Sequence, residues 1–451
     1  SVTGYDLSLL RIFSMKKCLS SSFLVITVLF CSAQTYLPFE QVRKYTKNQV
    51  PNKYDSSLKY LTNRLGAEVH YLYPFYQAIG WESKFKKTMG EKIFYTSFSQ
   101  FLSFAGDYSM ASSYILKNFD TLSSDAIGII SDTVDKLKNI QYVQAKNSII
   151  SNAAHYNVIM INESHIKPVH RAFTYSLLED LYKEGYRYLA MEAFNNYSNK
   201  CLDSINVFTG YYIMEPVAGE LVRKALQLGY RLISYEDTLA SEHSISQRDS
   251  VQAQNLYTVI RKDPSAKILV HAGYGHIRES KIDNYTPMAL WFKKISGIDP
   301  FTIDQTGMTE GSEFEYGRLF YQYFNARFNI TSSSIIYQNK RPFNPLEEKG
   351  YDVMLMHPAT IYQHNRPTWL SLNGEKKITL IQPTEKMLFF VQAYYENEYS
   401  SDMLNFLVPA DQTYITNREG YYCLYLRKGK YKIIMRDVSY KILATKDIEV
   451  L

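Results

Sequence analysis

The stretch from residue 157 to 170, NVIMINESHIKPVH, predicts a strand, a charged turn and a helix in that order. Residues 158–161 are apolar with a β-branched bias, which favours a buried strand. Polarity changes abruptly at Asn162, and Pro168 fits only the first turn of the helix that follows. The turn between them holds three side chains with reactive groups, Glu163, Ser164 and His165.

The same pattern of a strand that ends in a polar residue recurs along the chain. Further strands are predicted at residues 187–191, 231–235, 268–270 and 301–303. They end in carboxylates or imidazoles, namely Glu192, Glu236 with Asp237, His271, and Asp304. Segments with helical periodicity, roughly ten to twenty residues long, separate the strands, as parallel crossovers require. Because ligands bind outside the carboxyl ends of parallel strands, we expect one functional edge.

The predicted fold is α/β, an open and mainly parallel sheet with helices on both faces, an N-terminal helical cap and a C-terminal antiparallel β-sandwich. Residues 34–150 form the cap, with breaks near Gly80, Gly90 and Gly106, and a helix over residues 140–155 leads into the first strand. Residues 151–368 form the core domain, where residues 352–356 are a further strand. Residues 369–451 form the sandwich, with a hairpin turn at 428–429.

Residues 1–33 read as a leader. Lys16 and Lys17 precede a short apolar run at residues 23–30 and the small residues before Ala33, which is typical of a secretory signal peptide. The run is too short to span a membrane, so no transmembrane segment is predicted in the mature chain. We expect a secreted, periplasmic or cell-surface protein cleaved near Ala33. A lipid anchor at Cys31 is the alternative, which the bulky Phe30 disfavours.

Composition narrows the classes of partner. The chain has 451 residues, 46% of them hydrophobic and 21% charged, which suits a globular protein of two or three domains. The formal net charge of +6 is not gathered into a basic run, so no nucleic-acid partner is expected. Beyond the leader only Cys201 and Cys423 remain, and we interpret both as packed apolar residues rather than a disulfide.

Four residues are the candidate catalytic groups, Glu163, His165, Glu192 and His276. An imidazole paired with a carboxylate titrates near neutrality, so His165 can act as a general base on water. The same four residues could instead hold a divalent metal that activates the water. The expected substrate-binding residues are Arg171, Glu236 and His271.

Each of these residues also has a purely structural interpretation. Glu163 could cap the helix near Pro168, and Ser164 reads as a turn residue because no Gly-x-Ser-x-Gly elbow surrounds it. Arg248 is expected in an exposed first helical turn, with a cation over the third strand end as the alternative. The cap residues Glu82 and Asp107 are expected on a solvated face.

Several of these motifs together resemble a known family. Glu163-x-His165 after a strand, the Met191–Phe194 strand end, and Gly273-x-Gly275-His276 resemble the erythromycin esterase/ChaN-like group, which is related more distantly to the Tiki/TraB proteases. The spacing of Glu163 and His165 is closest to the ChaN haem-binding branch. The resemblance covers residues 157–306, and Asn162 stands where the family usually has Gly. It implies a secreted or periplasmic α/β protein and fixes no substrate.

Three functions remain open from the sequence. The first is a hydrolase that activates water for ester or amide hydrolysis of a small molecule or peptide. The second is a haem- or metal-binding protein without turnover, for which His170 and Tyr274 would be the cofactor-binding residues. The third is a surface protein that binds a ligand without catalysis.

Overall fold

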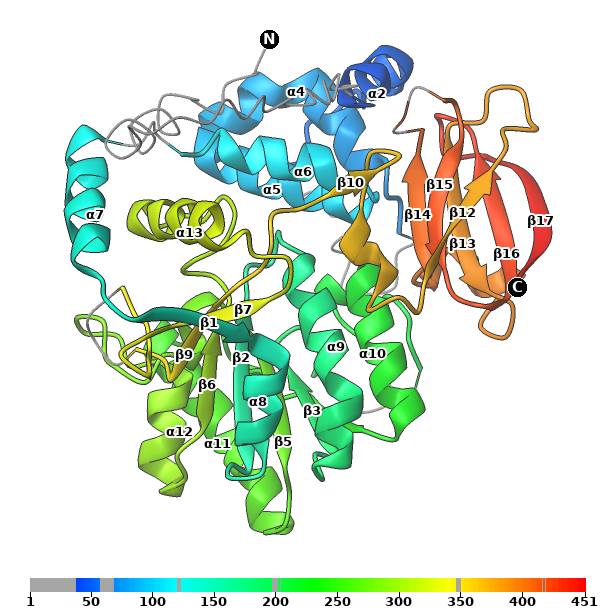
Figure 1. Ribbon diagram of the computed structural model, residues 1–451. Coiled ribbons are helices and arrows are strands. Elements are labelled where there is room, and N and C mark those ends of the chain that lie inside the picture. Colours follow the sequence, from blue (N-terminus) through cyan, green and yellow to red (C-terminus); the bar gives the residue numbers. More distant parts are fainter. Residues whose placement is uncertain are drawn as a thin grey trace. The chain divides into compact units, whose positions relative to one another are not determined.

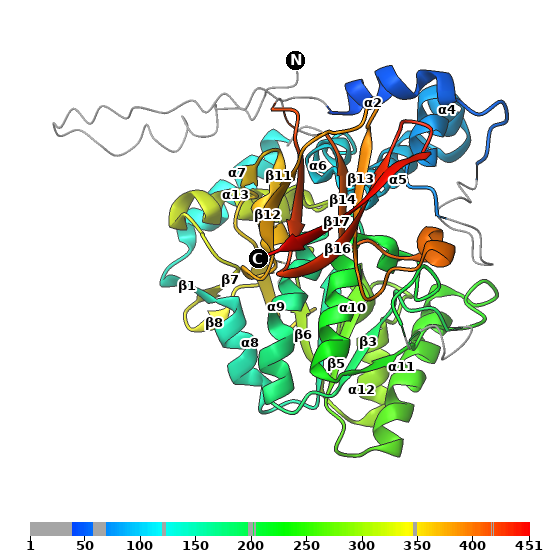
Figure 2. The same ribbon diagram turned by 90° about the vertical axis from the view of Figure 1, so that its right-hand side faces the viewer.

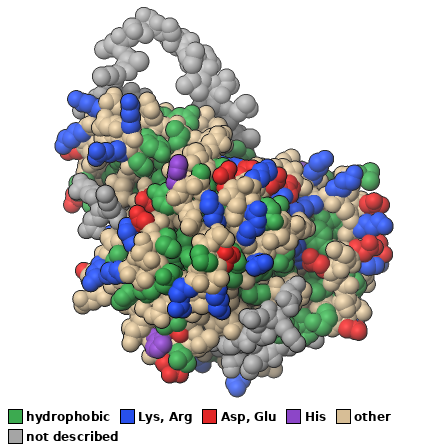
Figure 3. Space-filling model, turned by 90° about the horizontal axis from the view of Figure 1, so that it is seen from below, with side chains coloured by type: hydrophobic (Ala, Val, Ile, Leu, Met, Phe, Trp, Pro, Cys, Tyr) green, Lys and Arg blue, Asp and Glu red, His purple; other side chains and the backbone are tan. Residues whose placement is uncertain are grey.

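The computed structural model describes residues 38–56, 69–119, 123–196, 202, 204–345, 350–415, 417 and 419–451. The predicted leader and Cys201 lie outside these residues, so both interpretations stay predictions. No helix in the described part of the chain is long and apolar enough to cross a bilayer. Figure 3 shows Lys and Arg side chains dispersed among acidic and apolar ones on the face that it presents.

A nine-stranded sheet forms the centre of the molecule (Figure 1). Its strands are β1 (Ile140–Gln144), β2 (Val158–Glu163), β3 (Tyr188–Met191), β4 (Arg231–Ile233), β5 (Ile268–Gly273), β6 (Phe301–Asp304), β7 (Ser334–Gln338), β8 (Arg341–Pro342) and β9 (Val353–Met356). The order is β1-β7-β9-β6-β2-β5-β3-β4, with β8 paired to β7. The six strands from β9 to β4 run parallel, and β7 and β1 add antiparallel strands at one edge. The mainly parallel sheet is confirmed.

Helices cover both faces of this sheet, as predicted. On one face lie α8 (Ala145–Ala153), α9 (Val169–Lys183) and α10 (Pro216–Leu228), and on the other α11 (Ile245–Lys262) and α12 (Met288–Ser296). The strands are buried on both sides, because Ile159 and Ile161 face the first group while Val158 and Met160 face the second. Burial on both faces explains the continuous apolar runs from which the strands were predicted.

The N-terminal helices are α2 (Pro38–Thr46), η1 (Lys47–Gln49), α4 (Tyr73–Met89), α5 (Glu91–Phe104), α6 (Tyr108–Leu116) and α7 (Ser124–Lys136). Gly90 and Gly106 have positive φ and separate α4, α5 and α6, as predicted. The third predicted break, near Gly80, is a kink within α4, where the backbone of Trp81 is not helical. The aromatic face of this cap packs on the C-terminal sheet as well as on the core, since Phe75 and Phe98 share a cluster with strand residues near the C-terminus.

The C-terminal region consists of antiparallel strands in three sheets, one of them the short pair β10-β11. Its elements are β10 (Tyr362–Gln363), β11 (Arg366–Pro367), η5 (Thr368–Ser371), β12 (Lys377–Ile381), β13 (Phe390–Tyr395), η6 (Ser401–Phe406), β14 (Asp411–Tyr414), β15 (Tyr422–Leu426), β16 (Gly429–Arg436) and β17 (Ile442–Val450). The pair β12-β15 and the sheet β14-β13-β16-β17 enclose one apolar cluster. The predicted hairpin at 428–429 is wrong, because β15 pairs with β12 and β16 with β13. The chain crosses there from one sheet to the other. Cys423 in β15 is buried and free, as predicted.

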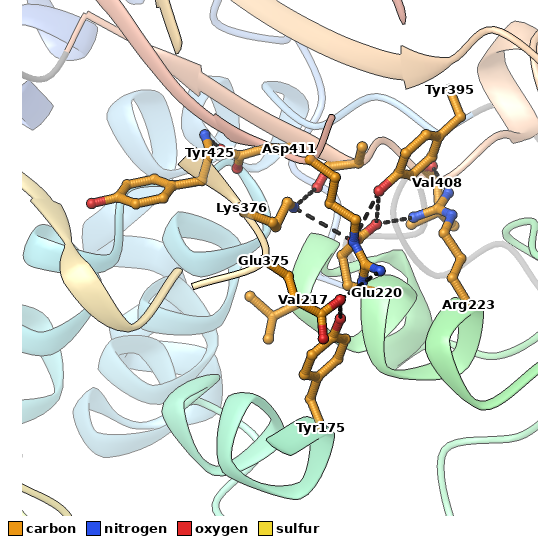
Figure 4. A network of polar contacts seen from close by, with 12 residues as sticks. Tyr175, Val217, Glu220, Arg223, Glu375, Lys376, Tyr395, Val408, Asp411 and Tyr425 are labelled. Atoms are coloured by element: carbon orange, nitrogen blue, oxygen red, sulfur yellow. Dashed lines mark hydrogen bonds and ion pairs between the residues drawn. The ribbon is translucent and has the colours of Figure 1, made fainter. Parts of the chain in front are cut away.

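A buried ionic cluster joins this region to the core domain (Figure 4). Glu220 of α10 accepts from Arg427 Nε at 3.0 Å and from Arg223 Nη1 at 3.1 Å, and Lys376 Nζ lies 3.7 Å away. Tyr395 donates to the same carboxylate. Burial raises the pKa of Glu220, but the cations outweigh it and lower the pKa to about 2. The carboxylate is therefore a charged link between α10 and the two β-sheets.

Two local predictions in the N-terminal half are wrong. Residues 140–144 form β1 and not the start of a helix, because Ile-Gln-Tyr-Val-Gln pairs along its whole length with β7 and only residues 145–153 are helical. Asp107 is buried and not solvated, since it caps α6 by accepting from the Met110 N–H and also accepts from the Tyr414 hydroxyl.

Candidate functional site

Glu163, the last residue of β2, is a buried carboxylate held by three basic side chains. Arg171 donates to Oε2 from Nε at 2.6 Å and to Oε1 from Nη2 at 2.8 Å. His165 Nδ1 lies 2.8 Å from Oε1, and His271 Nε2 lies 2.9 Å from Oε2. Burial raises the pKa of Glu163, but these partners outweigh it and hold the pKa well below its usual value. Glu163 is therefore an anion that orients two imidazoles, and it caps no helix.

Behind Glu163 lies a second buried carboxylate that fixes the arginine. Arg171 is fully buried on α9, and its Nη1 donates to Glu215 Oε2 at 3.3 Å. Glu215 caps α10 through two backbone N–H groups and accepts from the Tyr108 hydroxyl at 2.8 Å. The prediction that Arg171 binds substrate does not fit this position, because its guanidinium is occupied by protein carboxylates and has no exposed surface.

His165 is held in one orientation by its neighbours. Its ring stacks on Tyr212 at a centroid distance of 4.2 Å, and Tyr274 meets it edge-on at 5.3 Å. A Cβ at Gly273 would lie 2.5 Å from His165 Cε1 and Nε2, so only glycine allows the ring to pack against the end of β5. Nδ1 faces Glu163, and the side chain is 19% exposed, so the ring keeps access to solvent.

Glu192 and His276 lie beside this ring at the same edge of the sheet. Glu192 Oε2 accepts from the Gly273 N–H at 2.6 Å, and Oε1 lies 3.6 Å from His276 Nε2. Burial raises the pKa of Glu192, but His276, His165 and Arg248 outweigh it and lower the pKa to about 2. His276 Nδ1 lies 2.8 Å from Asp249 Oδ1. Burial lowers the pKa of His276, but the charges of Glu192 and Asp249 outweigh it and raise the pKa above its ordinary value.

Arg248 joins two of the predicted carboxylates. It donates from Nη2 to Glu192 Oε1 at 2.6 Å and from Nε to Glu236 Oε1 at 2.9 Å. Gln252, one turn further along α11, donates to the same Glu236 carboxylate. The expectation of an exposed helical turn is wrong for Arg248, and the alternative of a cation over the third strand end describes its position. Glu236 therefore belongs to the rim of the site with its charge already paired.

Asn162 and Tyr274 fasten the loop that carries His276. Asn162 Nδ2 donates to the Tyr274 carbonyl at 2.8 Å and to Asp304 Oδ1 at 2.6 Å. Tyr274 has a φ of +44°, an uncommon conformation for a residue with a side chain, and its hydroxyl lies 3.1 Å from Ser164 Oγ. The amide at position 162, where the resembled family usually has Gly, thus ties the ends of β2 and β6 to this loop.

The residues of this site do not fit a metal or a haem. The four candidate ligands Glu163, His165, Glu192 and His276 are engaged with Arg171, Arg248, Asp249 and one another. No group of three or more His, Cys, Asp or Glu side chains in the described part of the chain is arranged to hold a metal ion. His170, the expected haem ligand, is fully buried, and its Nδ1 accepts from the Ser164 N–H at 2.9 Å.

The structure brings eight of the nine predicted site residues to one edge, with His170 buried beneath them. Sequence reasoning missed three residues that complete it, Glu215, Tyr212 and Asp249. The Glu215–Pro216 pair was an available signal, because an acidic residue before proline is typical of a helix start. Tyr212 and Asp249 carry no such signal, since their roles depend on contacts across the sheet.

The fold and the site together define the class of this protein. It is an α/β protein that carries paired histidines and carboxylates at the carboxyl ends of its parallel strands. No family model matches this chain, and no curated protein matches it. Among solved structures, the type III effector HopBA1 aligns at 12% identity over 50% of this chain and 99% of its own, with a TM-score of 0.32. RRSP, a MARTX toxin effector domain from Vibrio vulnificus, aligns at 11% identity over 64% of this chain and 66% of its own, with a TM-score of 0.31. Likenesses this weak carry no argument about function.

Proposed function

We propose that this protein is a hydrolase that uses the Glu163–His165 pair to activate water for attack on an ester or amide. The observation that carries the proposal is the 2.8 Å contact between His165 Nδ1 and the buried, anionic Glu163. An ionised carboxylate only accepts, so Nδ1 carries the proton and the neutral ring has its lone pair on Nε2. That is the tautomer a general base requires.

The reaction would run through these residues in three steps. His165 Nε2 takes a proton from water as the water oxygen bonds to the carbonyl carbon. The carbonyl oxygen becomes an anion, and the protonated form of His276, which Glu192 and Asp249 favour, would stabilise that charge. The C–O or C–N bond then breaks, and the proton on His165 passes to the leaving alcohol or amine. Glu163 stabilises the imidazolium between the first and last steps.

The buried partners support this role for His165. Arg171 holds Glu163 ionised and is itself fixed by Glu215, so the carboxylate cannot rotate away from Nδ1 without losing several hydrogen bonds. Tyr212 and Gly273 restrict the ring on its two sides. A general base held by packing and by a carboxylate is preorganised, which is what an active site needs. The proposal also agrees with the resemblance to the erythromycin esterase/ChaN-like group.

A substrate screen with matched variants tests the proposal. Purified protein is assayed on panels of activated esters and of peptides, together with the His165→Ala and His243→Ala variants. His243 is the matched control, since it is also a partly exposed histidine paired with a carboxylate, Asp237, at the same rim. We expect His165→Ala to lose about a hundredfold to ten-thousandfold in rate and His243→Ala to stay near the wild type. If His165→Ala is as active as the wild type on a substrate that the wild type turns over, the hydrolase proposal is rejected.

A further inference from the structure

The edge strand β1 is exposed and carries none of the features that usually protect such an edge. β1, Ile-Gln-Tyr-Val-Gln, has no charged residue, no proline and no bulge in its register with β7. Tyr142 is 47% exposed and Val143 39%. Unprotected edges of this kind pair with another strand.

A long edge strand of the C-terminal region differs in this respect. β17 spans nine residues at the edge of the C-terminal sheet and carries Lys446, Asp447 and Glu449. A register shift also interrupts its pairing with β16 near Arg436. β4, at the opposite end of the central sheet, has three residues and begins with Arg231. Charges, a bulge or shortness thus protect these two edges, and β1 has none of the three.

The hydrogen-bond pattern fixes which groups of β1 face outward. The Ala145 N–H donates to the Ser333 carbonyl at 2.8 Å, and Val143 and Gln141 follow in the same register with β7. Along an antiparallel strand, the backbone N–H and C=O groups of successive residues point alternately towards and away from the neighbouring strand. The groups of Ile140, Tyr142 and Gln144 therefore point away from β7. In the described part of the chain no backbone–backbone hydrogen bond outside the helices and strands reaches Ile140 or Tyr142, whereas Gln144 is the N-cap of α8 and its carbonyl accepts the first bond of that helix. Tyr142 therefore sits at the centre of three outward-facing residues.

We propose that β1 pairs antiparallel with β1 of a second copy of this chain, about a twofold axis at Tyr142. In this register Tyr142 exchanges both backbone hydrogen bonds with the partner's Tyr142, and the Gln144 N–H donates to the carbonyl of the partner's Ile140. Because β1 has no charged residue, its pairing with β1 of a second copy brings no like charges together. The two tyrosines form a cross-strand aromatic pair. The interface is isologous, as the common twofold dimers are. This inference is independent of the proposed hydrolase.

The surface beside β1 fits the same partner. A hollow of about 510 Å³ lies between β1 and α8, lined by Val143, Tyr337 and the α8 residues Asn147, Ser148 and Ser151. The twofold axis of an antiparallel pair is perpendicular to the sheet, so it keeps α8 of both copies on the same face. The serines are small enough to allow the two α8 helices to approach across the hollow. Two joined sheets with adjacent α8 helices would cover both β1 and this hollow.

The mass of the chain in solution tests the proposal. Light scattering on the purified chain at micromolar concentration should give twice the 52.4 kDa of one chain. Tyr142→Pro removes only an outward N–H, a change that an edge strand tolerates, and Tyr142→Lys adds charge at the axis. Both variants should give the single-chain mass, and Met387→Lys, at a 75% exposed site in the C-terminal region, should stay dimeric. Circular dichroism checks that each variant is folded. If Tyr142→Pro is unfolded, the result for Tyr142→Lys decides the test.

A cross-link separates this interface from any other dimer. Residues facing each other in a hydrogen-bonded antiparallel pair have Cα atoms about 5.5 Å apart, within the range of a disulfide. Tyr142→Cys should therefore give a covalent dimer on mild oxidation, and Met387→Cys should not. A single-chain mass for the wild type, a folded Tyr142→Lys that stays dimeric, or a Tyr142→Cys dimer that does not cross-link would each overturn the proposal.

Discussion

Glu163 and Glu220 are both buried carboxylates surrounded by basic side chains, yet their partners differ in kind. Glu220 is bound by Arg223 and Arg427, whose guanidinium groups keep their charge at any physiological pH, and by Lys376, whose pKa is lowered by burial. Glu163 is bound by one arginine and by two imidazoles, His165 and His271, side chains that can carry either one or two ring protons.

The difference separates a structural ionic cluster from a chemical one. Around Glu220 the two guanidinium groups keep their charge, and the cluster joins α10 to the C-terminal sheets. Around Glu163 one imidazole is sealed in the protein, since His271 is 2% exposed, while the side chain of His165 is 19% exposed. Burial and low pKa alone therefore do not mark a reactive site. A reactive site is marked by a side chain that can exchange a proton and has access to solvent.

The largest effect should come from removing the charge of Glu163. Glu163→Gln keeps the size of the side chain but no longer fixes the His165 tautomer, so we expect turnover to fall by about ten-thousandfold. Asp237→Asn is the control, because it changes the corresponding carboxylate of the His243 pair at the rim. Steady-state kinetics of the two variants measures the difference. Comparable turnover in Glu163→Gln and Asp237→Asn would contradict a special role for Glu163.

Removing the charge of Glu220 should affect stability instead. Glu220→Gln leaves Arg223, Arg427 and Lys376 buried without their common anion, which costs about 3–5 kcal/mol of unfolding free energy. Turnover per folded molecule should stay at the wild-type value. Denaturant unfolding measures the first quantity, and Glu398→Gln, which changes a more exposed partner of Arg223, should cost about 1 kcal/mol or less. The comparison fails if Glu220→Gln is as stable as Glu398→Gln.

The two ends of the pH range should report on different groups, with smaller effects. Glu192 and Glu220 have folded pKa values of about 2, below the ordinary 4.5, so their stabilisation is present above pH 4.5 and is lost as the pH falls towards 2. His276 has a raised pKa, so its contribution is complete below its ordinary value of 6.5 and is lost as the pH rises through the folded pKa.

Unfolding free energies measured across pH test both directions. Glu220→Gln should reduce the loss of stability on the acid side and leave the alkaline side unchanged. His276→Gln should reduce the loss of stability on the alkaline side, and because His276 helps to lower the pKa of Glu192 it should also reduce the loss on the acid side. An acid limb that is the same in Glu220→Gln and the wild type would show that this carboxylate is not held ionised by its cations.

The strands of the central sheet were predictable because burial on both faces leaves a local mark. β2 and β5 read as continuous apolar runs, and β12 begins and ends where alternation predicts. Residues 140–144 were misread because a short stretch with β-branched residues is ambiguous until its partner is known. That partner, β7, lies almost two hundred residues away and was not predicted.

The site was predictable at strand ends and not elsewhere. Glu163, Glu192, Glu236 and His271 follow or end apolar runs, so position along the sequence indicated a shared edge. Arg248 and Asp249 reach the site from the first turns of α11, and Tyr212 comes from a short 3-10 helix. Nothing in the local sequence of Asp249 or Tyr212 indicates a neighbour across the sheet. The importance of Gly273 likewise became visible only once His165 was found packed against it.

The most direct test of the central claim is rescue of His165→Ala by free imidazole. The alanine leaves space beside Gly273 and Tyr212 for an imidazole molecule, which can accept the proton that His165 Nε2 would take. We expect turnover to rise with imidazole concentration, while His271→Ala, which removes the sealed imidazole on the same Glu163 carboxylate, should not respond. A folded His165→Ala that imidazole leaves inactive, or that needs no rescue at all, would contradict the assignment of His165 as the general base.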